Sequence, residues 1–566
     1  MEYIIFLGTF VLLMLLLAIK GMWDTKKAEK LFVKNLHDTY GSIPQKEYKT
    51  ERFERIPGFY YAHRHKGQLD DITWNDLNMD EIFKRLNYTF SAAGEEYLYY
   101  TLRSPKMKEE ELQYFENIVS YFSVEEEKRI TIQLLAHKLG YTGKFSLYDY
   151  LNYIGTLGKR SNLKHMLLDL AFIPSILFCF VNISLGLFLI AVLMIYNIVT
   201  YFQEKKVIEP YMSSFAYIIR LLSISEKIAK LKLPPCEDNL ILMREHNKRL
   251  SRMKGFSSWG ISKAVMSGGN PLDILIDYIR MTFHVDLMMF NNMFAELQKH
   301  IEDVEVITEQ IGYIETAIAI GSFRKSLELP YCIPTFIKRE EGQQKGHICV
   351  KNAYHPLIQN PVTNSIKADK GVLLTGSNAS GKSTFLKTIA LEAVLAQTIN
   401  TCMAEEYTAQ FFHIYSSMSL HDSIESGESY YIVEIKALKR IIDVAQNKEN
   451  NVLCFVDEVL RGTNTVERIA ASTQILLSFS HENLCCFAAT HDIELTSLLE
   501  AKYDNYHFEE EIRDGDIYFN YQLLDGKATT RNAIKLLEIM GYEEDIIEKA
   551  RIQAEAFIEK GKWELA

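Results

Sequence analysis

The sequence predicts a C-terminal α/β domain, with a parallel sheet and flanking helices, preceded by an all-α core or lever domain and by transmembrane helices. Three observations predict this order. After Leu329–Pro330, short β-branched runs alternate with helical patterns, as in a parallel sheet with crossover helices. Before that point, apolar residues recur at spacings of three and four, for example from Ile301 to Ile318. Two long apolar runs, 3–19 and 166–202, complete the pattern.

Bulk composition sets limits on the kind of protein. A chain of 566 residues is too long for one hydrophobic core and implies several domains. The formal net charge of -11 argues against coating nucleic acid by bulk attraction, although a local basic groove could still bind DNA. The eight cysteines contain no CxxC pair and no Cys/His spacing of the zinc type, so we expect no zinc and reduced thiols.

The first apolar run, 3–19, carries no charge and is just long enough to cross a bilayer. Basic residues follow it instead of preceding it, which is unlike a signal peptide: Lys20, Lys26, Lys27 and Lys30. The sequence therefore predicts an uncleaved anchor at 1–20, with the N-terminus outside, and a juxtamembrane segment at 21–77 in the cytoplasm.

The second apolar run predicts a transmembrane hairpin at 166–203. It is too long for one crossing and is interrupted at 181–186. Basic residues flank both ends, which predicts that both ends are cytoplasmic: Lys159, Arg160, Lys164, Lys205 and Lys206. The protein would then be a multi-pass membrane protein with its soluble domains in the cytoplasm. The alternative is a buried helical hairpin in a soluble bundle. It is disfavoured because the long run contains only one charged residue, Asp169, which is unusual for a helical hairpin of a soluble protein.

Amphipathic helical patterns on either side of the hairpin predict a helical core in two parts, 78–165 and 204–330. Such apolar stripes are typical of core or of helix–helix seams and need no ligand. The rest of the chain, 331–566, is the predicted α/β domain with a C-terminal helical tail.

The first functional motif of that domain is a phosphate-binding loop. The strand-like segment 371–375 runs into G-x-x-x-x-G-K-S and then into a helical segment, the order that a P-loop requires. Glycines let the backbone wrap phosphate oxygens, and amides at the helix N-terminus meet their charge. We therefore expect an α/β P-loop NTPase domain that binds ATP through Gly376, Ser377, Asn378, Ala379, Ser380, Gly381, Lys382, Ser383 and Thr384.

A second motif supplies carboxylates. The apolar segment 451–456 ends in Asp457 and Glu458, as a Walker B strand does. We expect Ser383 and Asp457 to hold Mg²⁺, with Lys382 on the β and γ phosphates. Glu458 would orient and deprotonate the attacking water, which makes the protein a Mg-dependent ATP hydrolase.

Four segments resemble motifs of the MutS family. Residues 375–384, TGSNASGKST, resemble TGPNMSGKST, and residues 457–465, DEVLRGTNT, resemble DEIGRGTST. Residues 489–495, ATHDIEL, match ATHxxEL, and the resemblance implies that His491 senses the γ-phosphate region. Residues 426–434, SGESYYIVE, are similar to SGRSTFMVE, a segment that reaches the partner's nucleotide in a dimer. The resemblance gives that catalytic role to Ser429.

The C-terminal segment 525–556 resembles the family's helical dimerisation tail, which implies a homodimer. Several residues depart from the family motifs. Ser377 replaces Pro, Leu460 replaces Gly, Glu428 replaces Arg, and Tyr430–Tyr431 replaces Thr-Phe. The last two departures fall in the segment that the resemblance places against the partner subunit.

The resemblance implies a mismatch-repair type of protein, but direct mismatch reading is not expected. Only about sixty residues separate the anchor from the helical core, and Phe59 begins a Phe-x-Glu-like segment that has no glutamate. The first hypothesis is a membrane-tethered dimeric ATPase whose helical clamp engages DNA. The alternative is a membrane-remodelling or transport-coupled ATPase with a non-DNA partner; an LSGGQ-type signature of ABC transporters is absent from the sequence.

Overall fold

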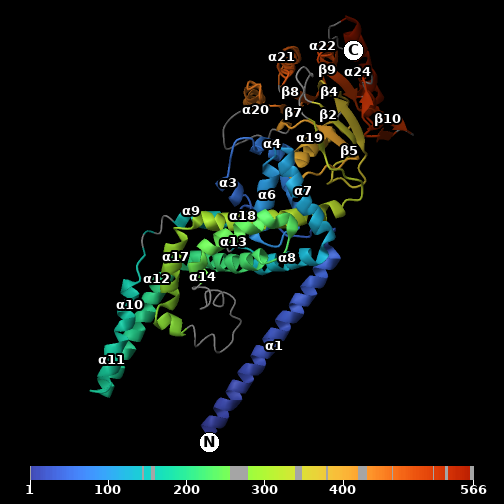
Figure 1. The fold of residues 1–566 in the computed structure, drawn as a ribbon. Helices are drawn as coiled ribbons and strands as arrows, with labels where there is room; N and C mark the ends of the chain where they lie inside the picture. Colours follow the sequence, from blue (N-terminus) through green and yellow to red (C-terminus); the bar gives the residue numbers. More distant parts are fainter. Residues whose placement is uncertain are drawn as a thin grey trace. The chain divides into compact units, whose positions relative to one another are not determined.

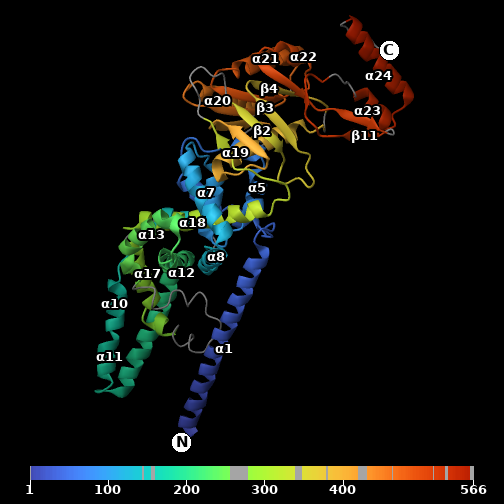
Figure 2. The same ribbon diagram turned by 45° about the vertical axis from the view of Figure 1, so that its right-hand side comes forward.

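A computed structural model describes residues 2–142, 146–154, 158, 160–254, 278–337, 347–377, 380–418, 430–461, 463–513, 516–528 and 533–560. The chain divides into two compact units. Unit 1 comprises 1–64, 86–100 and 116–326, and unit 2 comprises 65–85, 101–115 and 327–566. Figures 1 and 2 show the helices of unit 1 and the sheets of unit 2.

The regular elements among the described residues of unit 1 are helices. Its two longest packed helices are α12 (Ile183–Ala229) and α18 (Ile301–Lys325), and α18 packs against α12, α13 (Glu237–Arg249) and α8 (Glu126–Leu139). The side chains of α18 are buried around most of its circumference, because helices cover it on several sides. Its other helices are α1 (Glu2–Thr39), α2 (Thr50–Phe53), α3 (Gly58–Ala62), α9 (Leu147–Ile154), α10 (Leu163–Leu170), α11 (Phe172–Phe178), α14 (Ser251–Lys254) and α17 (Val285–Leu297), with a 3-10 turn at Pro234–Cys236.

The predicted helical hairpin is present in unit 1. Helices α10 and α11 run up to a break at residues 179–182, and α12 begins at Ile183, where the Asn182 side chain accepts a hydrogen bond from Leu185 N. Apolar side chains of the hairpin face outward, including Leu177 at 60% and Phe188 at 63% exposure. In both ribbon views the N-terminal part of α1 and this hairpin project from the same side of the layer formed by α8, α13 and α18.

Within the described part of the chain, one segment is long and apolar enough to cross a membrane, Ile183–Glu209, with a mean hydropathy of 2.3. The sequence predicts three crossings, so the described residues do not support a multi-pass arrangement. The physical reason in the hairpin is that α10 and α11 are separate helices of 8 and 7 residues, each far shorter than the roughly 20 residues of a spanning helix. Single helices of this length and hydropathy also occur in the cores of soluble proteins.

Unit 2 contains the predicted parallel sheet. Its six strands lie in the order β12-β9-β4-β8-β7-β6, and all neighbouring pairs are parallel except β12 with β9. The central strands β4 (Gly371–Thr375) and β8 (Leu484–Ala489) are buried along their whole length, as strands covered on both faces are. The remaining strands are β6 (His413–Ser417), β7 (Val452–Asp457), β9 (Tyr503–His507) and β12 (Leu524–Asp525).

A second sheet of four strands has the order β1-β5-β2-β3 and includes antiparallel pairs. Its strands are β1 (Thr335–Phe336), β2 (Ile348–Ala353), β3 (Asn364–Ala368) and β5 (Glu406–Ala409), and β10 (Glu510–Arg513) and β11 (Asp516–Phe519) form a separate hairpin. The helices of unit 2 include α4 (Asp71–Asp76), α19 (Lys382–Ile399), α20 (Tyr430–Ala445), α21 (Thr465–Ser478), α22 (Glu494–Leu498), α23 (Ala533–Ile539) and α24 (Glu544–Lys560). Helices α5 (Met79–Leu86), α6 (Ala92–Arg103) and α7 (Glu109–Val124) contribute residues to both units.

A helical N-terminal region followed by an α/β domain with a largely parallel sheet is therefore confirmed. The four-stranded sheet with antiparallel pairs was not predicted. In the six-stranded sheet, the neighbours β4, β8 and β7 bring three widely separated segments of the chain to one edge.

Candidate functional site

Three predicted motifs meet at the carboxyl edge of the central strands. The phosphate-binding loop follows β4, the carboxylate pair stands at the end of β7, and His491 follows β8. Since β8 lies between β4 and β7 and all three are parallel, their carboxyl ends point the same way. Ligands of open α/β sheets bind at this edge.

The loop after β4 has a backbone that glycine permits. Gly376 has φ 144°, and a Cβ there would lie 2.7 Å from the Phe508 carbonyl oxygen. Gly381 has φ 107° immediately before α19. Both positions have a positive φ, a backbone conformation that is strained for residues other than glycine. Two predicted loop residues, Asn378 and Ala379, lie outside the described residues.

The Lys382 side chain folds back into this loop. Its amine donates to the carbonyl oxygens of Gly376 at 2.9 Å and Ser377 at 2.7 Å, and it lies 3.5 Å from His491 Nε2. The residue is 5% exposed, and burial lowers the pKa of the amine. The positive group is thus held at the N-terminus of α19, where backbone amides also favour an anion.

Ser383 and Asp457 form the second part of the site. The Ser383 hydroxyl donates to Asp457 Oδ2 at 2.5 Å, and the other oxygen, Asp457 Oδ1, is buried without a hydrogen-bond partner among the described residues. Burial raises the pKa of Asp457, and the hydrogen bond from Ser383 opposes that rise. A buried carboxylate oxygen that lacks a partner beside a hydroxyl fits the oxygen ligands that Mg²⁺ prefers.

Glu458 stands between two cationic or polar partners. Its carboxylate oxygens lie 2.9 Å from His491 Nε2 and 2.7 Å from Arg461 Nε. The hydrogen bond with His491 is the largest cause that lowers the pKa of Glu458. Glu458 has φ 53° and Leu460 has φ 60°, so this short turn holds two side chains in the left-handed region.

The pH dependence of hydrolysis follows from this pair. A general base must be ionised, and His491 keeps the pKa of Glu458 below its ordinary value. In His491→Ala we expect the pKa of Glu458 to rise, so the acid limb of the kcat profile moves to higher pH. Steady-state ATPase rates from about pH 4.5 to 8 measure this shift.

The exposed residue His481 provides the control, and His481→Ala should leave the acid limb in place. A lower rate in His491→Ala with an unmoved acid limb would show that His491 does not set the ionisation of Glu458. That result would leave a role for His491 elsewhere in the site.

Other predicted residues divide into described and undescribed ones. Ser380 donates to the Ser377 carbonyl oxygen at 2.8 Å, Ser377 donates to Glu510 Oε2 at 2.6 Å, and the side chain of Thr384 is exposed. Ser429 lies outside the described residues, so its role stays a prediction. Glu434, from the same segment, is 4% exposed and accepts a hydrogen bond from Leu460 N at 2.5 Å.

A cavity of about 390 Å³ adjoins the first turn of α19 and was not predicted. One side of the cavity is formed by Gly381 and by three residues of α19, and the rest comes from the 353–364 segment, Phe508 and Tyr521; the α19 residues are Thr384, Phe385 and Thr388. The cavity has room for a flat ring, and its lining is mostly apolar with a few polar groups, as in small-molecule sites. Nothing in the sequence of 353–364 marks it, because its residues match no phosphate or metal motif.

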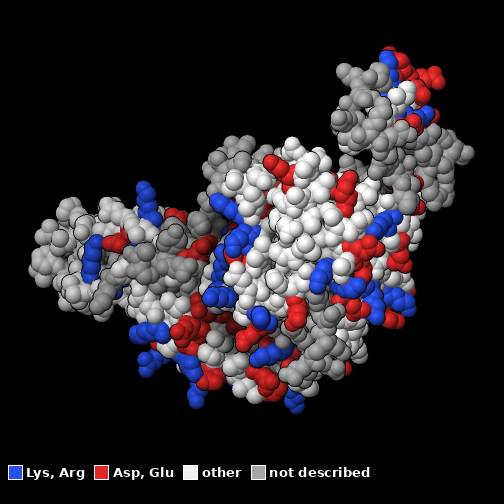
Figure 3. Space-filling model, turned by 90° about the horizontal axis from the view of Figure 1, so that it is seen from above, with Lys and Arg blue, Asp and Glu red and all other residues white. Residues whose placement is uncertain are grey.

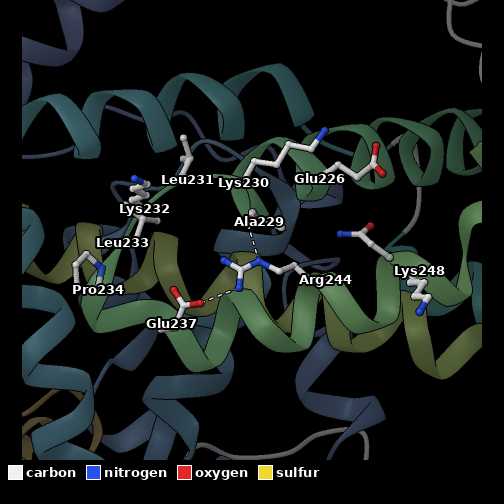
Figure 4. A pocket seen from close by; sticks show the side chains of 11 residues that line it. Glu226, Ala229, Lys230, Leu231, Lys232, Leu233, Pro234, Glu237, Arg244 and Lys248 are labelled. Carbon is white, nitrogen blue, oxygen red and sulfur yellow. Dashed lines mark hydrogen bonds and ion pairs between the residues drawn. The ribbon is translucent and has the colours of Figure 1, made fainter.

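A larger space, about 910 Å³, lies in unit 1 between the end of α12 and α13 (Figure 4). Its central Arg244 is already engaged, donating to the Ala229 carbonyl oxygen at 2.9 Å and to Glu237 Oε1 at 2.7 Å. The amines of Lys230 and Lys248 point away from one another. This space therefore lacks a convergent set of charged groups, and the edge of the parallel sheet is the better candidate site.

The fold and the site define the class: an α/β P-loop domain with a nucleotide-type site at the carboxyl edge of its sheet. Comparison with known families agrees with this class. Residues 372–558 match the family model of MutS domain V, an ABC-like ATPase domain. An ATPase domain of this kind implies ATP and Mg²⁺ as ligands.

Curated relatives are similar over the same part of the chain. The DNA mismatch repair protein MutS of Thermus thermophilus is 32% identical over 208 residues, 36% of this chain and 25% of the relative. That of Pseudothermotoga lettingae is 30% identical over 231 residues, 39% of this chain and 28% of the relative. A more distant MutS, from Streptococcus agalactiae, is 26% identical over 326 residues, 55% of this chain and 36% of the relative. The chain thus spans about a quarter to a third of the length of these relatives.

Proposed function

We propose that this protein is a Mg-dependent ATP hydrolase that works as a membrane-attached homodimer and transmits nucleotide state to its helical domain. One observation carries the proposal. Lys382, the Ser383–Asp457 pair and the Glu458–His491 pair meet at one sheet edge, although they come from three distant segments. The match to MutS domain V supports the same chemistry.

Each residue has a proposed role. The loop from Gly376 to Thr384 binds the phosphates through backbone amides, and Lys382 leaves the loop carbonyls to bind β and γ oxygens. Ser383 and Asp457 hold Mg²⁺, which would neutralise charge on the phosphate oxygens. Glu458 orients a water molecule and accepts its proton, and His491 holds the Glu458 carboxylate ionised and in place. The protein thereby positions the nucleophile and offsets charge, which is most of phosphoryl-transfer catalysis.

The cavity beside Gly381 is the proposed site for the adenine base. The cavity adjoins the phosphate-binding loop, because Gly381 of the loop and Thr384 and Thr388 of the helix that follows it line the cavity. We expect Ile358→Ala, at the partly exposed rim, to weaken ATP binding about three- to tenfold, since it removes apolar wall worth about 1 kcal/mol or more. Binding of inorganic tripolyphosphate, which has no base, should not change.

Calorimetric titration with both ligands measures the two affinities. Ile333→Ala, at another exposed apolar residue of unit 2, is the control and should leave both unchanged. Equal weakening of ATP and tripolyphosphate would place the base elsewhere.

The domain organisation belongs to the proposal. We assign 1–20 as an anchor, 21–77 as a juxtamembrane segment, 78–165 and 204–330 as the helical core, 166–203 as a transmembrane hairpin and 331–566 as the ATPase domain with its tail. The outward apolar side chains of the hairpin and the shared direction of α1 and the hairpin support membrane attachment. Retention of the protein in carbonate-washed membranes tests it, and release into the wash would contradict it.

The dimer is proposed from the resemblance of the C-terminal tail and of the segment that contains Ser429. In such an arrangement Ser429 of one protomer reaches the nucleotide of its partner. ATP would bring the two nucleotide domains together, and the helical domains would move with them.

DNA is the first candidate for what the helical domains engage, on the strength of the resemblance to MutS. The face in Figure 3 shows Lys and Arg interspersed with Asp and Glu among its described residues. With a net charge of -11, bulk attraction for DNA is weak, so binding would need a local groove. The exposed apolar hairpin favours the alternative, an ATPase that remodels or couples to a membrane partner other than DNA.

Salt separates the two candidates. The full chain in detergent, held with ATP in the Glu458→Gln form, is titrated with duplex DNA at about 50 and about 200 mM salt. DNA engagement predicts binding at low salt that weakens by orders of magnitude at high salt, because phosphate contacts release counterions. Absence of binding at the lower salt concentration would remove DNA and leave the membrane partner.

A further inference from the structure

Two cysteines of unit 2 face each other across an isolated antiparallel bridge. Cys332 N donates to the Cys402 carbonyl oxygen at 2.9 Å, and Cys402 N donates to the Cys332 carbonyl oxygen at 3.0 Å. A pair that exchanges both bonds has Cα atoms about 5.5 Å apart, inside the roughly 4.4–6.8 Å range that a disulfide spans. Both cysteines are free thiols in the structure.

The two thiols differ in access. Cys332 is half-buried, whereas Cys402 is fully buried and its thiol donates to the Glu392 carbonyl oxygen at 3.8 Å. The neighbouring Cys402 side chain lowers the pKa of Cys332, and burial raises the pKa of Cys402. Thiolate character and access both make Cys332 the sulfur that reacts first.

We propose that Cys332 and Cys402 form a redox-modification site that exchanges with low-molecular-weight disulfides and closes into a reversible internal disulfide. The site stands on the cross-strand position of the two residues and is independent of the proposed ATPase function. Cys402 follows the C-terminal end of α19 by three residues, and Lys382 begins that helix. The disulfide would therefore tie the far end of the phosphate-binding helix to the segment before β1.

The exchange takes place in two steps with oxidised glutathione as oxidant. The Cys332 thiolate attacks one glutathione sulfur; the glutathione S–S bond breaks, and one glutathione leaves as a thiolate that takes up a proton. Cys402 then loses its proton to solvent, and its thiolate attacks Cys332 Sγ. The mixed disulfide breaks, and the second glutathione leaves as a thiolate that takes up a proton from solvent. Two protein thiols are oxidised by two electrons, and one glutathione disulfide is reduced to two thiols.

The chain supplies a matched control pair. Cys454 and Cys486 are register partners on the parallel strands β7 and β8, which also brings their two side chains close together. Both are 0% exposed in the core of the sheet. In both pairs the two cysteines lie close together. Of these four cysteines, only Cys332 is accessible to an oxidant.

The experiment treats the reduced full chain in detergent with oxidised glutathione, blocks remaining thiols with iodoacetamide, and maps the products by mass spectrometry. We expect a Cys332–Cys402 cross-linked peptide in nearly all molecules, lost again with dithiothreitol, while Cys454 and Cys486 become alkylated only after unfolding. In Cys402→Ser, Cys332 should remain joined to glutathione because no second thiol resolves it. In Cys332→Ser, Cys402 should stay a free thiol.

Thermal unfolding checks that each variant folds, and Cys402→Ala replaces Cys402→Ser if the hydroxyl is not tolerated in the buried position. An unmodified Cys332 in the wild type would overturn the proposal. So would a glutathione adduct at Cys332 that persists in the wild type as it does in Cys402→Ser. Simultaneous oxidation of Cys454 and Cys486 would also overturn it, since reaction would then not depend on the exposed bridge.

Discussion

The Lys382→Ala variant is expected to lose measurable ATP binding while keeping its fold. The amine lies inside the loop between two carbonyl oxygens, and the proposal has it bind phosphate oxygens when ATP enters. Hydrogen bonds to a charged group contribute about 1.5–3 kcal/mol each, so the loss corresponds to an affinity at least about 100-fold weaker. Fluorescence titration with a labelled ATP analogue measures it.

Lys370→Ala is the matched control for this prediction. Lys370 directly precedes β4, at the opposite end of that strand from the loop, and its exposed side chain lies 3.8 Å from Asp504. Its removal should leave nucleotide affinity within about twofold, because surface pairs contribute little. If Lys382→Ala binds ATP as tightly as the Lys370→Ala control, the phosphates do not bind at the loop after β4.

The Glu458→Gln variant is expected to bind ATP normally and to turn it over about 100-fold more slowly or worse. Glutamine keeps the size and a hydrogen-bonding oxygen but cannot accept the proton of the attacking water. General-base catalysis contributes about 10²–10⁴ in rate, which sets the expected loss. The affinity should stay within about threefold, since Lys382, Ser383 and Asp457 are unchanged.

Single-turnover hydrolysis of radiolabelled ATP separates the chemical step from product release in this variant. Glu467→Gln, an exposed residue in the first turn of α21, is the control and should hydrolyse ATP at the wild-type rate. Wild-type turnover in Glu458→Gln would reject the base assignment. A parallel loss of ATP binding would show that Glu458 serves binding instead of catalysis.

The alternation of β-branched runs with helical patterns after Leu329–Pro330 predicted the parallel sheet. Within it, strand, phosphate-binding loop and helix follow each other within a few residues. Lys382 and Ser383 are fixed by that local order. Asp457 and His491 are distant from the loop in sequence, and the parallel strand order β4-β8-β7 brings them beside it. The Walker B pattern predicted that Asp457 lies beside the loop, whereas His491 was placed there only through the resemblance to MutS, because periodicity alone does not specify strand order.

Other features carried no local signal. The cavity beside Gly381 is built from 353–364, Phe508 and Tyr521, which come together only through packing. The bridge between Cys332 and Cys402 joins residues far apart in sequence, and no cysteine spacing marks it. The antiparallel pairs of β2 were also missed, although the mixed burial of β2 differs from the uniform burial of the central strands β4 and β8.

Membrane attachment was predicted from local apolar runs, and the structure supports a long apolar helix in only part of the second run. Ile183–Glu209 is a continuous apolar helix, whereas α10 and α11 are short and separate. A hydropathy pattern measures how apolar a run is but not where its helix breaks, which depends on packing and on a cap such as Asn182. The described residues therefore support one apolar helix, and three crossings stay a proposal.

The central claim is that a nucleotide's phosphates bind the loop after Gly376, with Mg²⁺ between Ser383 and Asp457. An experimental structure of the full chain with Mg²⁺ and a non-hydrolysable ATP analogue tests it most directly. We expect Lys382 Nζ on the β and γ oxygens, the metal about 2.1 Å from Ser383 Oγ and bridged to Asp457 by water, and the base beside Gly381. A nucleotide bound away from this loop, or a metal with neither residue near it, would contradict it.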